Sequence, residues 1–263
     1  MVGGAALARS NAIGATRLAA FTPRFFWVRA CAGTTSLSVL LGALLVSSLA
    51  HAGRPLTTED AGVIEEGRCQ LEAWVDRSRE ATDTWIAPAC NVGLGIEWQL
   101  GAARSRQSGS ARLAETYAQA KKSLRDLEDA SPWGLALVVG VTRRPQDPVR
   151  RGWDHPFAAL PLTVAFGDTL AHASIGWSRD RSEQRDVTPW GIALETPAGE
   201  RLTLVGEAFG ESSARPFLRA GGRYSLIKDS LEIDLTVVAR PGGGRGERLV
   251  SLGVFWQSGR FMP

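Results

Sequence analysis

The sequence has few residues that bind metals. Only three cysteines and three histidines occur among 263 residues, and Cys31 falls in the leader described below. Outside that leader the histidines are His155 and His172, and neither has a cysteine neighbour at ligand spacing. We therefore expect no metal site and no cofactor. The glycine-rich run at 241–246 is not followed by Lys-Ser or Lys-Thr, so it does not predict a phosphate-binding loop.

Acidic residues are absent from the first 52 positions, which carry four arginines. A short apolar run over about 37–49 follows and ends in Ala50-His51-Ala52, a small-x-small cleavage site. This order predicts a cleaved secretory signal peptide at 1–52. The alternative, an uncleaved anchor helix, is disfavoured by the shortness of the run. Because the stretch before Arg29 is long for a signal, we expect translation to start near Val28.

The basic charge belongs to this leader. Its removal takes away four positive charges, so the formal net charge of +3 becomes −1. A balanced chain without a basic stripe does not suggest nucleic acid as a partner.

Long apolar runs are also lacking after residue 52, and none approaches the roughly 18 residues of a membrane helix. Instead, apolar and polar residues alternate, as in Leu231, Ile233, Leu235 and Val237 with acidic or hydroxyl residues between them. A soluble sandwich also alternates, but it places its charges in the surrounding water. An exported all-β chain of such strands predicts a transmembrane antiparallel up-and-down β-barrel of about 12 strands, with lipid outside and a polar lumen.

The alternation sets the expected organisation: an N-terminal periplasmic or lumenal segment at 53–68, the barrel at 69–257 and a tail at 258–263. The expected strands are 69–77, 84–91, 95–103, 113–122, 133–142, 155–166, 169–179, 187–195, 201–210, 215–226, 231–240 and 248–257.

Connections between these strands alternate in length. The longer ones are expected at 104–112, 143–154, 180–186 and 241–247. External loops are the long ones in such barrels, so both termini are expected in the periplasm. The long connection 123–132 breaks this alternation, and its Leu124, Leu127 and Ala130 spacing suggests one or two helical turns.

Cys69 and Cys90 are expected to face each other. A hairpin that turns near Arg79–Glu80 makes them a directly opposed pair, with Cβ atoms about 4.5–5.5 Å apart. In an oxidising periplasm this favours a disulfide. Two free, half-buried thiols are the alternative.

Charged residues on the polar face are expected to line the lumen. They are Glu72, Asp76, Glu97, Glu195, Glu207, Glu232, Asp234, Arg219 and Arg223. The candidates for setting solute selectivity are Glu97, Glu207, Arg219, Arg223, Glu232 and Asp234. The alternative is a structural ion-pair network that fills a narrow barrel, and a pair of Glu207 with Arg219 or Arg223 fits that alternative.

Four motifs carry a family resemblance. Arg54-Pro-Leu-Thr-Thr-Glu-Asp-Ala61, followed by Gly67-Arg-Cys-Gln-Leu-Glu72, resembles the mature start of the outer-membrane family called "MetA-pathway of phenol degradation". Leu204-Val-Gly-Glu-Ala-Phe-Gly210 resembles its Glu-x-x-Gly strand. His172-Ala-Ser-Ile-Gly176 resembles its His-x-Asn-x-Gly strand, with Ser174 in place of Asn.

The resemblance implies a barrel for uptake of hydrophobic or aromatic compounds, or a porin-like transporter. Such barrels usually end on an aromatic residue that the barrel-assembly machinery reads, and the tail after Trp256 departs from this. We thus expect a small-solute channel in the outer membrane of a Gram-negative-type bacterium, with lipid, solute and assembly machinery as partners.

Two other functions stay open. An outer-membrane lipid hydrolase would use His172 and Ser174, which share one face of a strand. Because the apolar residues Ala171, Ala173 and Ile175 are expected to face lipid, His172 and Ser174 are expected to point into the lumen. No acidic residue on this strand is well placed as their partner. The third possibility is a non-conducting envelope scaffold.

Overall fold

The computed structural model describes residues 53–261, apart from 108, 129–130, 148–150, 213 and 245–246. The expected signal peptide and translation start lie outside these residues. The strands are β1 (Arg68–Ser78), β2 (Ala81–Asn91), β3 (Ile96–Gln107), β4 (Ser110–Arg125), β5 (Trp133–Arg143), β6 (Trp153–Phe166), β7 (Thr169–Asp180), β8 (Arg185–Val187), β9 (Pro189–Pro197), β10 (Leu202–Glu211), β11 (Phe217–Ile227), β12 (Leu231–Ala239) and β13 (Arg248–Gln257).

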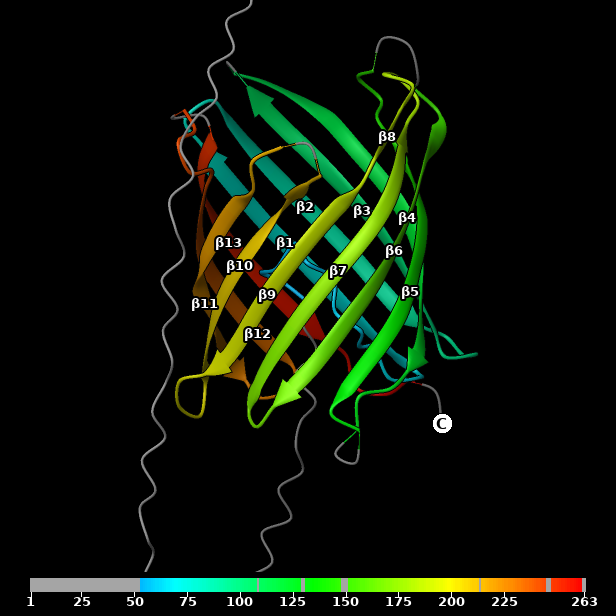
Figure 1. Cartoon of the computed structure of the whole chain (residues 1–263), viewed down its shortest axis with the longest axis vertical. Helices are drawn as coiled ribbons and strands as arrows, with labels where there is room; N and C mark the ends of the chain where they lie inside the picture. Colours follow the sequence, from blue (N-terminus) through cyan, green and yellow to red (C-terminus); the bar gives the residue numbers. More distant parts are fainter. Residues whose placement is uncertain are drawn as a thin grey trace, which may run out of the picture. The chain divides into compact units, whose positions relative to one another are not determined.

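All strands belong to one closed antiparallel sheet (Figure 1). Apart from β8 and β9, which both pair with β7, each strand pairs with its neighbours in the chain, and β1 pairs with β13 to close the barrel. The short β8 and the longer β9 pair with β7 in one continuous register, separated only by Thr188. They form one strand of the wall, which therefore has twelve. The predicted fold is confirmed.

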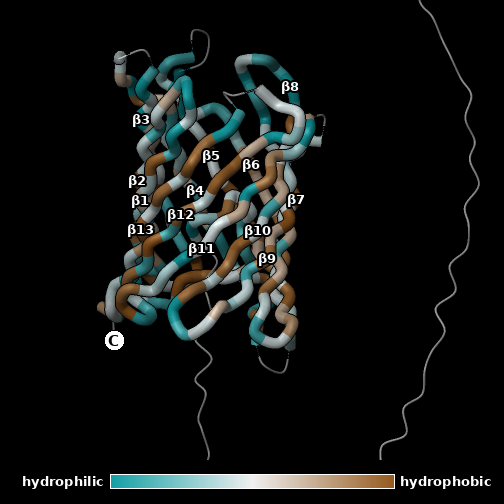
Figure 2. Tube along the Cα trace, turned by 90° about the vertical axis from the view of Figure 1, so that its left-hand side faces the viewer, coloured by the Kyte–Doolittle hydropathy of each residue, from teal (hydrophilic) through white to brown (hydrophobic). Residues whose placement is uncertain are grey.

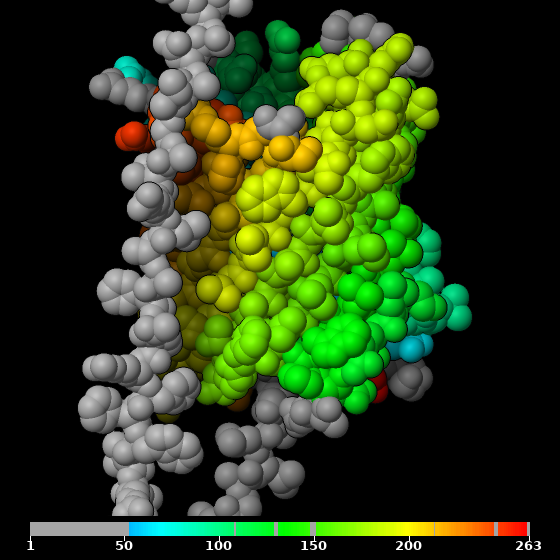
Figure 3. Space-filling model, viewed as in Figure 1, coloured from blue at the N-terminus to red at the C-terminus, as the bar shows by residue number. Residues whose placement is uncertain are grey.

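The two faces of the wall differ as the alternation requires. Outward side chains such as Leu235 and Leu252 are each 57% exposed, whereas inward Thr236 and Ser251 are at most 1% exposed. Figure 2 shows apolar and polar residues alternating along the strands. In Figure 3 the side chains of the green and yellow-green strands pack side by side over the viewed face. The polar interior and apolar exterior reverse the usual distribution of a soluble protein.

The predicted hairpin and disulfide are confirmed. Cys69 pairs with Cys90 in the β1–β2 ladder, and the two are disulfide-bonded with 4.0 Å between their Cα atoms. The β1–β2 turn at 79–80 gives this register.

The barrel has two distinct ends. At the turn end lie the connections 92–95, 167–168, 198–201 and 228–230, together with the start of β1 and the end of β13. At the loop end lie the connections 144–152, 181–184, 212–216 and 240–247. Within residues 53–261 and their stated gaps, no helix is long and apolar enough to cross a membrane.

Two expected connections are wrong. The loop expected at 104–112 is strand instead, because β3 continues to Gln107 and β4 begins at Ser110. Gly109 turns this hairpin at a φ of 82°. The hydrogen-bonded ladder extends past the apolar belt, where water meets both faces and alternation is no longer required.

The second error concerns 123–132. Strand β4 continues to Arg125, and Glu128 forms an antiparallel bridge with Ser131. The described part of this connection therefore holds a strand end and an antiparallel bridge in place of the helical turn that the spacing allowed; Asp129 and Ala130 lie outside the described residues.

Candidate functional site

Residues 53–64, called here the lumen segment, run inside the barrel. In Figure 1 this part of the chain is the blue trace behind the front strands. Arg54, Thr58, Asp60, Ala61 and Ile64 are all buried. An irregular segment has no ladder to satisfy its backbone, so wall side chains must supply the partners. It forms hydrogen bonds with side chains of β1, β2, β3, β4, β6, β10, β11, β12 and β13.

At the turn end, Ile64 fixes the base of the lumen segment. Its backbone N–H donates to Glu97 Oε2 at 3.0 Å, and Asn91 Nδ2 donates to its carbonyl at 2.7 Å. Just below, the Gly67 N–H donates to the Asn91 carbonyl at 2.9 Å, and the Phe261 N–H donates to the Gly67 carbonyl at 2.8 Å. The tail after β13 thus crosses the point where the chain enters the barrel.

Half-way along, Lys121 on β4 and Thr163 on β6 hold two consecutive residues of the segment. Lys121 Nζ lies 3.0 Å from Asp60 Oδ1. The Ala61 N–H donates to Thr163 Oγ1 at 2.9 Å. That oxygen also lies 2.9 Å from His172 Nδ1, so the Thr163 hydroxyl links the lumen segment to the imidazole on β7.

Glu207 accepts the hydrogen bonds of the next part of the segment, Thr57 and Thr58. It receives the Thr57 N–H at 2.8 Å, the Thr58 N–H at 2.5 Å and the Thr58 hydroxyl at 2.7 Å. Its other oxygen lies 3.0 Å from Arg219 Nη1. On the neighbouring strand β9, Gly191 leaves space for Thr58, since a Cβ at 191 would overlap the Thr58 hydroxyl.

Arg54 anchors the far end. Its Nη2 donates to Asp234 Oδ1 at 3.0 Å and to Ser251 Oγ at 2.7 Å. Its guanidinium carbon lies 4.6 Å from the ring centre of Trp74, a cation–π contact. Gly253 makes room for it, because a Cβ there would lie 2.8 Å from Arg54 Nη2.

Arg223 connects this anchor to the wall. It donates to the Arg54 carbonyl at 3.0 Å, to Glu195 Oε2 at 2.6 Å, and lies 3.1 Å from Glu232 Oε2. Charged hydrogen bonds of this kind are the strongest in proteins.

The structure therefore gathers the six candidate selectivity residues around the lumen segment. Glu97, Glu207, Arg219, Arg223 and Asp234 contact it directly, and Glu232 reaches it through Arg223. Each charge is already matched by a charge or a backbone dipole of the segment or the wall. Their role in selectivity stays a prediction.

Sequence reasoning missed the partners that the segment supplies, above all Arg54 and Asp60, and the wall residue Lys121. One signal was present. Gly191 and Gly253 occupy inward positions of strands, and a glycine within a strand often marks a close approach of another backbone or ligand.

Two cavities formed by the described residues bear on the site, and only the first is lined by the lumen segment. One of about 130 Å³ lies between it and the wall of β1, β3 and β4, and is lined by residues including Gly53, Glu72, Glu97 and Tyr117. The other, of about 230 Å³, lies toward the loop end, near His155 and Asp180.

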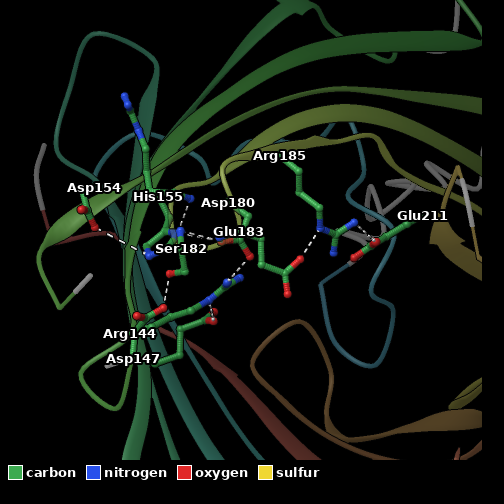
Figure 4. A network of polar contacts seen from close by, with 11 residues as sticks. Arg144, Asp147, Asp154, His155, Asp180, Ser182, Glu183, Arg185 and Glu211 are labelled. Atoms are coloured by element: carbon green, nitrogen blue, oxygen red, sulfur yellow. Dashed lines mark hydrogen bonds and ion pairs between the residues drawn. The ribbon is translucent and has the colours of Figure 1, made fainter. Parts of the chain in front are cut away.

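A polar network surrounds the second cavity (Figure 4). Arg144 lies 3.0 Å from Asp180 Oδ2, and Arg185 lies 3.6 Å from Glu211 Oε2. His155 Nε2 lies 3.6 Å from Asp154 Oδ1. The first contact joins the connection after β5 to β7, the second joins β8 to β10, and the third lies within β6.

The chemistry available in the lumen is binding and electrostatics. His172 and Ser174 share the inner face of β7, and the imidazole is engaged by Thr163. Among the described residues, no cluster of three or more His, Cys, Asp or Glu is placed to hold a metal.

Known barrels share this architecture. The structure of the KdgM porin matches with a TM-score of 0.53 at 7% identity, over 71% of this chain and 98% of that one. A NanC porin structure matches at 0.54 and 9% identity, over 72% and 98%. The COG4313 outer membrane channel from Pseudomonas putida F1 matches at 0.51 and 9% identity, over 77% and 100%.

At such identities the likeness establishes the fold. No curated protein matches the chain. The family model described as "Uncharacterised conserved protein UCP029691" matches residues 40–255, which is most of the sequence, and the chain belongs to that family.

Proposed function

We propose that the protein is an outer-membrane channel for small solutes whose lumen is closed at rest by the lumen segment. The observation that carries this is the set of hydrogen bonds from residues 53–64 to nine strands around the inner wall. The apolar outer face and the likeness to porins support the membrane location. The resemblance to the phenol-degradation family suggests hydrophobic or aromatic solutes, and the connection lengths suggest periplasmic termini.

Conduction then requires the lumen segment to move. Each hydrogen bond to a charged group contributes about 1.5–3 kcal/mol, and several must break together at Arg54, Asp60 and Glu207. Spontaneous opening should therefore be rare. Once the segment has moved, the six inward charges are left to interact with the solute.

Single-channel recording of the chain from Gly53, in a planar lipid bilayer, tests this proposal. We expect the unaltered chain to be mostly silent with brief openings. Arg54→Ala removes the contacts to Asp234, Ser251 and Trp74, so long and frequent openings are expected. The control is Arg77→Ala on β1, where the side chain is exposed and outside the lumen.

Silence of all three chains, with the barrel correctly folded, would contradict a channel. The non-conducting scaffold would then be the better description, because a filled lumen suits it equally well.

A further inference from the structure

Glu72 is a buried carboxylate with one modest partner. It lies on the inner face of β1 and is 8% exposed. It accepts the Arg54 N–H at 3.2 Å, and no described cationic side chain lies within ion-pair distance of it. Glu195, Glu207 and Asp234, by contrast, each form an ion pair with an arginine. A buried carboxylate without an ion-pair partner is unfavourable, so a cation placed next to Glu72 would stabilise it.

Gly53 lies against that carboxylate. A Cβ placed on Gly53 would overlap Glu72 Oε1, so the oxygen sits beside the Gly53 α-carbon, and the Gly53 nitrogen is one bond further. Both residues line the cavity of about 130 Å³. There is therefore room near Glu72 for a small, solvated cationic group.

The sequence places the expected cleavage site directly before this position, at Ala50-His51-Ala52. Hydrolysis adds water across the Ala52–Gly53 amide and breaks its C–N bond. The products are a carboxylate on Ala52 and an amine on Gly53, which takes up a proton at neutral pH. In the uncleaved chain the same nitrogen is a neutral amide.

We propose that cleavage after Ala52 creates a terminal ammonium group on Gly53 that pairs with Glu72 and completes the seating of the lumen segment. Processing by a signal peptidase would thus do more than release the chain from its leader. It would supply Glu72 with an ion-pair partner. The effect on conductance rests on the proposed function; the pairing itself does not.

The chain allows the amine to be removed alone. Cys69 permits native chemical ligation of a synthetic peptide of residues 53–68 to a recombinant chain of residues 69–263, followed by refolding and oxidation. One peptide begins with free Gly53. The other begins with acetyl-Arg54, which retains every heavy atom of Gly53 except its nitrogen. Each is joined to the natural chain and to Glu72→Gln, where no carboxylate is available.

The main readout is amide hydrogen exchange of the lumen segment. With Glu72 present, loss of the amine should lower its protection about tenfold, a typical coupling between contacting groups. With Glu72→Gln, the two peptides should give equal protection. Equal protection in the Glu72 chains would overturn the proposal, and so would the same loss in both backgrounds, since that effect would not involve the carboxylate.

Conductance of the four chains separates the two hypotheses. If the pairing holds in hydrogen exchange and the acetyl-Arg54 chain also opens more often, both hypotheses stand. If the pairing holds but every chain is silent, the ammonium–Glu72 contact stands while the channel function fails.

Discussion

At the scale of single residues, the charges inside the barrel act mainly on each other and on the lumen segment. Glu207 shows this most clearly, because it accepts hydrogen bonds from Thr57 and Thr58 and pairs with Arg219. Glu207→Ala leaves the buried Arg219 without its counter-charge, which should lower the free energy of unfolding by about 3–5 kcal/mol. Urea unfolding in phospholipid vesicles measures this. Glu80→Ala, at an exposed turn, should change it by less than about 0.5 kcal/mol.

Single residues also determine how closely the lumen segment can pack against the wall. Gly191→Ala would push its methyl group into Thr58, whereas a Cβ at Gly206, on β10, meets nothing within 4 Å. We expect Gly191→Ala to raise the open probability in bilayers and Gly206→Ala to leave it unchanged. Thr58→Gly removes the overlap together with the hydroxyl that binds Glu207, so adding Gly191→Ala to Thr58→Gly should leave the open probability of that single variant unchanged. A change in that open probability would mean that Gly191 matters for a reason other than Thr58.

At the scale of elements, the lumen segment and the wall hold complementary charges, so removing the segment should expose the wall. A chain of residues 65–263 should conduct readily and melt at a lower temperature than the chain from Gly53. In this open form, Arg223→Ala removes a positive charge from the lumen and should shift the reversal potential toward cation selectivity. The outward-facing variant Arg77→Ala is the control. An unchanged reversal potential would exclude Arg223 as a selectivity residue.

The strands could be predicted from the sequence, but the lumen segment's path could not. Alternation fixes which side chains face inward, because a shift of one residue would turn every apolar side chain of a strand into the lumen. The Cys69–Cys90 pair follows from the same rule. The ends of β3 and β4 escaped prediction because alternation fades beyond the apolar belt. The contacts of Arg54 and Asp60 escaped because an irregular segment has no periodicity that could reveal its partners.

At the scale of the whole molecule, the barrel combines an apolar exterior with an interior held by polar contacts. A soluble protein derives most of its stability from an apolar core; here many large apolar side chains of the strands are exposed on the outer face. The interior must then be held by hydrogen bonds and ion pairs, and many of these form only when the lumen segment lies inside the barrel. Seating of the lumen segment and stability of the barrel are therefore coupled properties.

The apolar outer face allows a prediction that depends on the position of a residue along the barrel axis and not on the lumen. Leu235 lies in the middle of β12 opposite Leu252, whereas Leu226 lies near the turn end of β11. Leu235→Arg should lower the free energy of unfolding in vesicles by about 2–4 kcal/mol, and Leu226→Arg by about 0–1 kcal/mol, because charge is most unfavourable at mid-membrane. Urea titrations of vesicle-bound protein measure both. Equal costs at the two depths would contradict a membrane centred on the apolar belt, since only a lipid environment makes the position along the barrel axis matter.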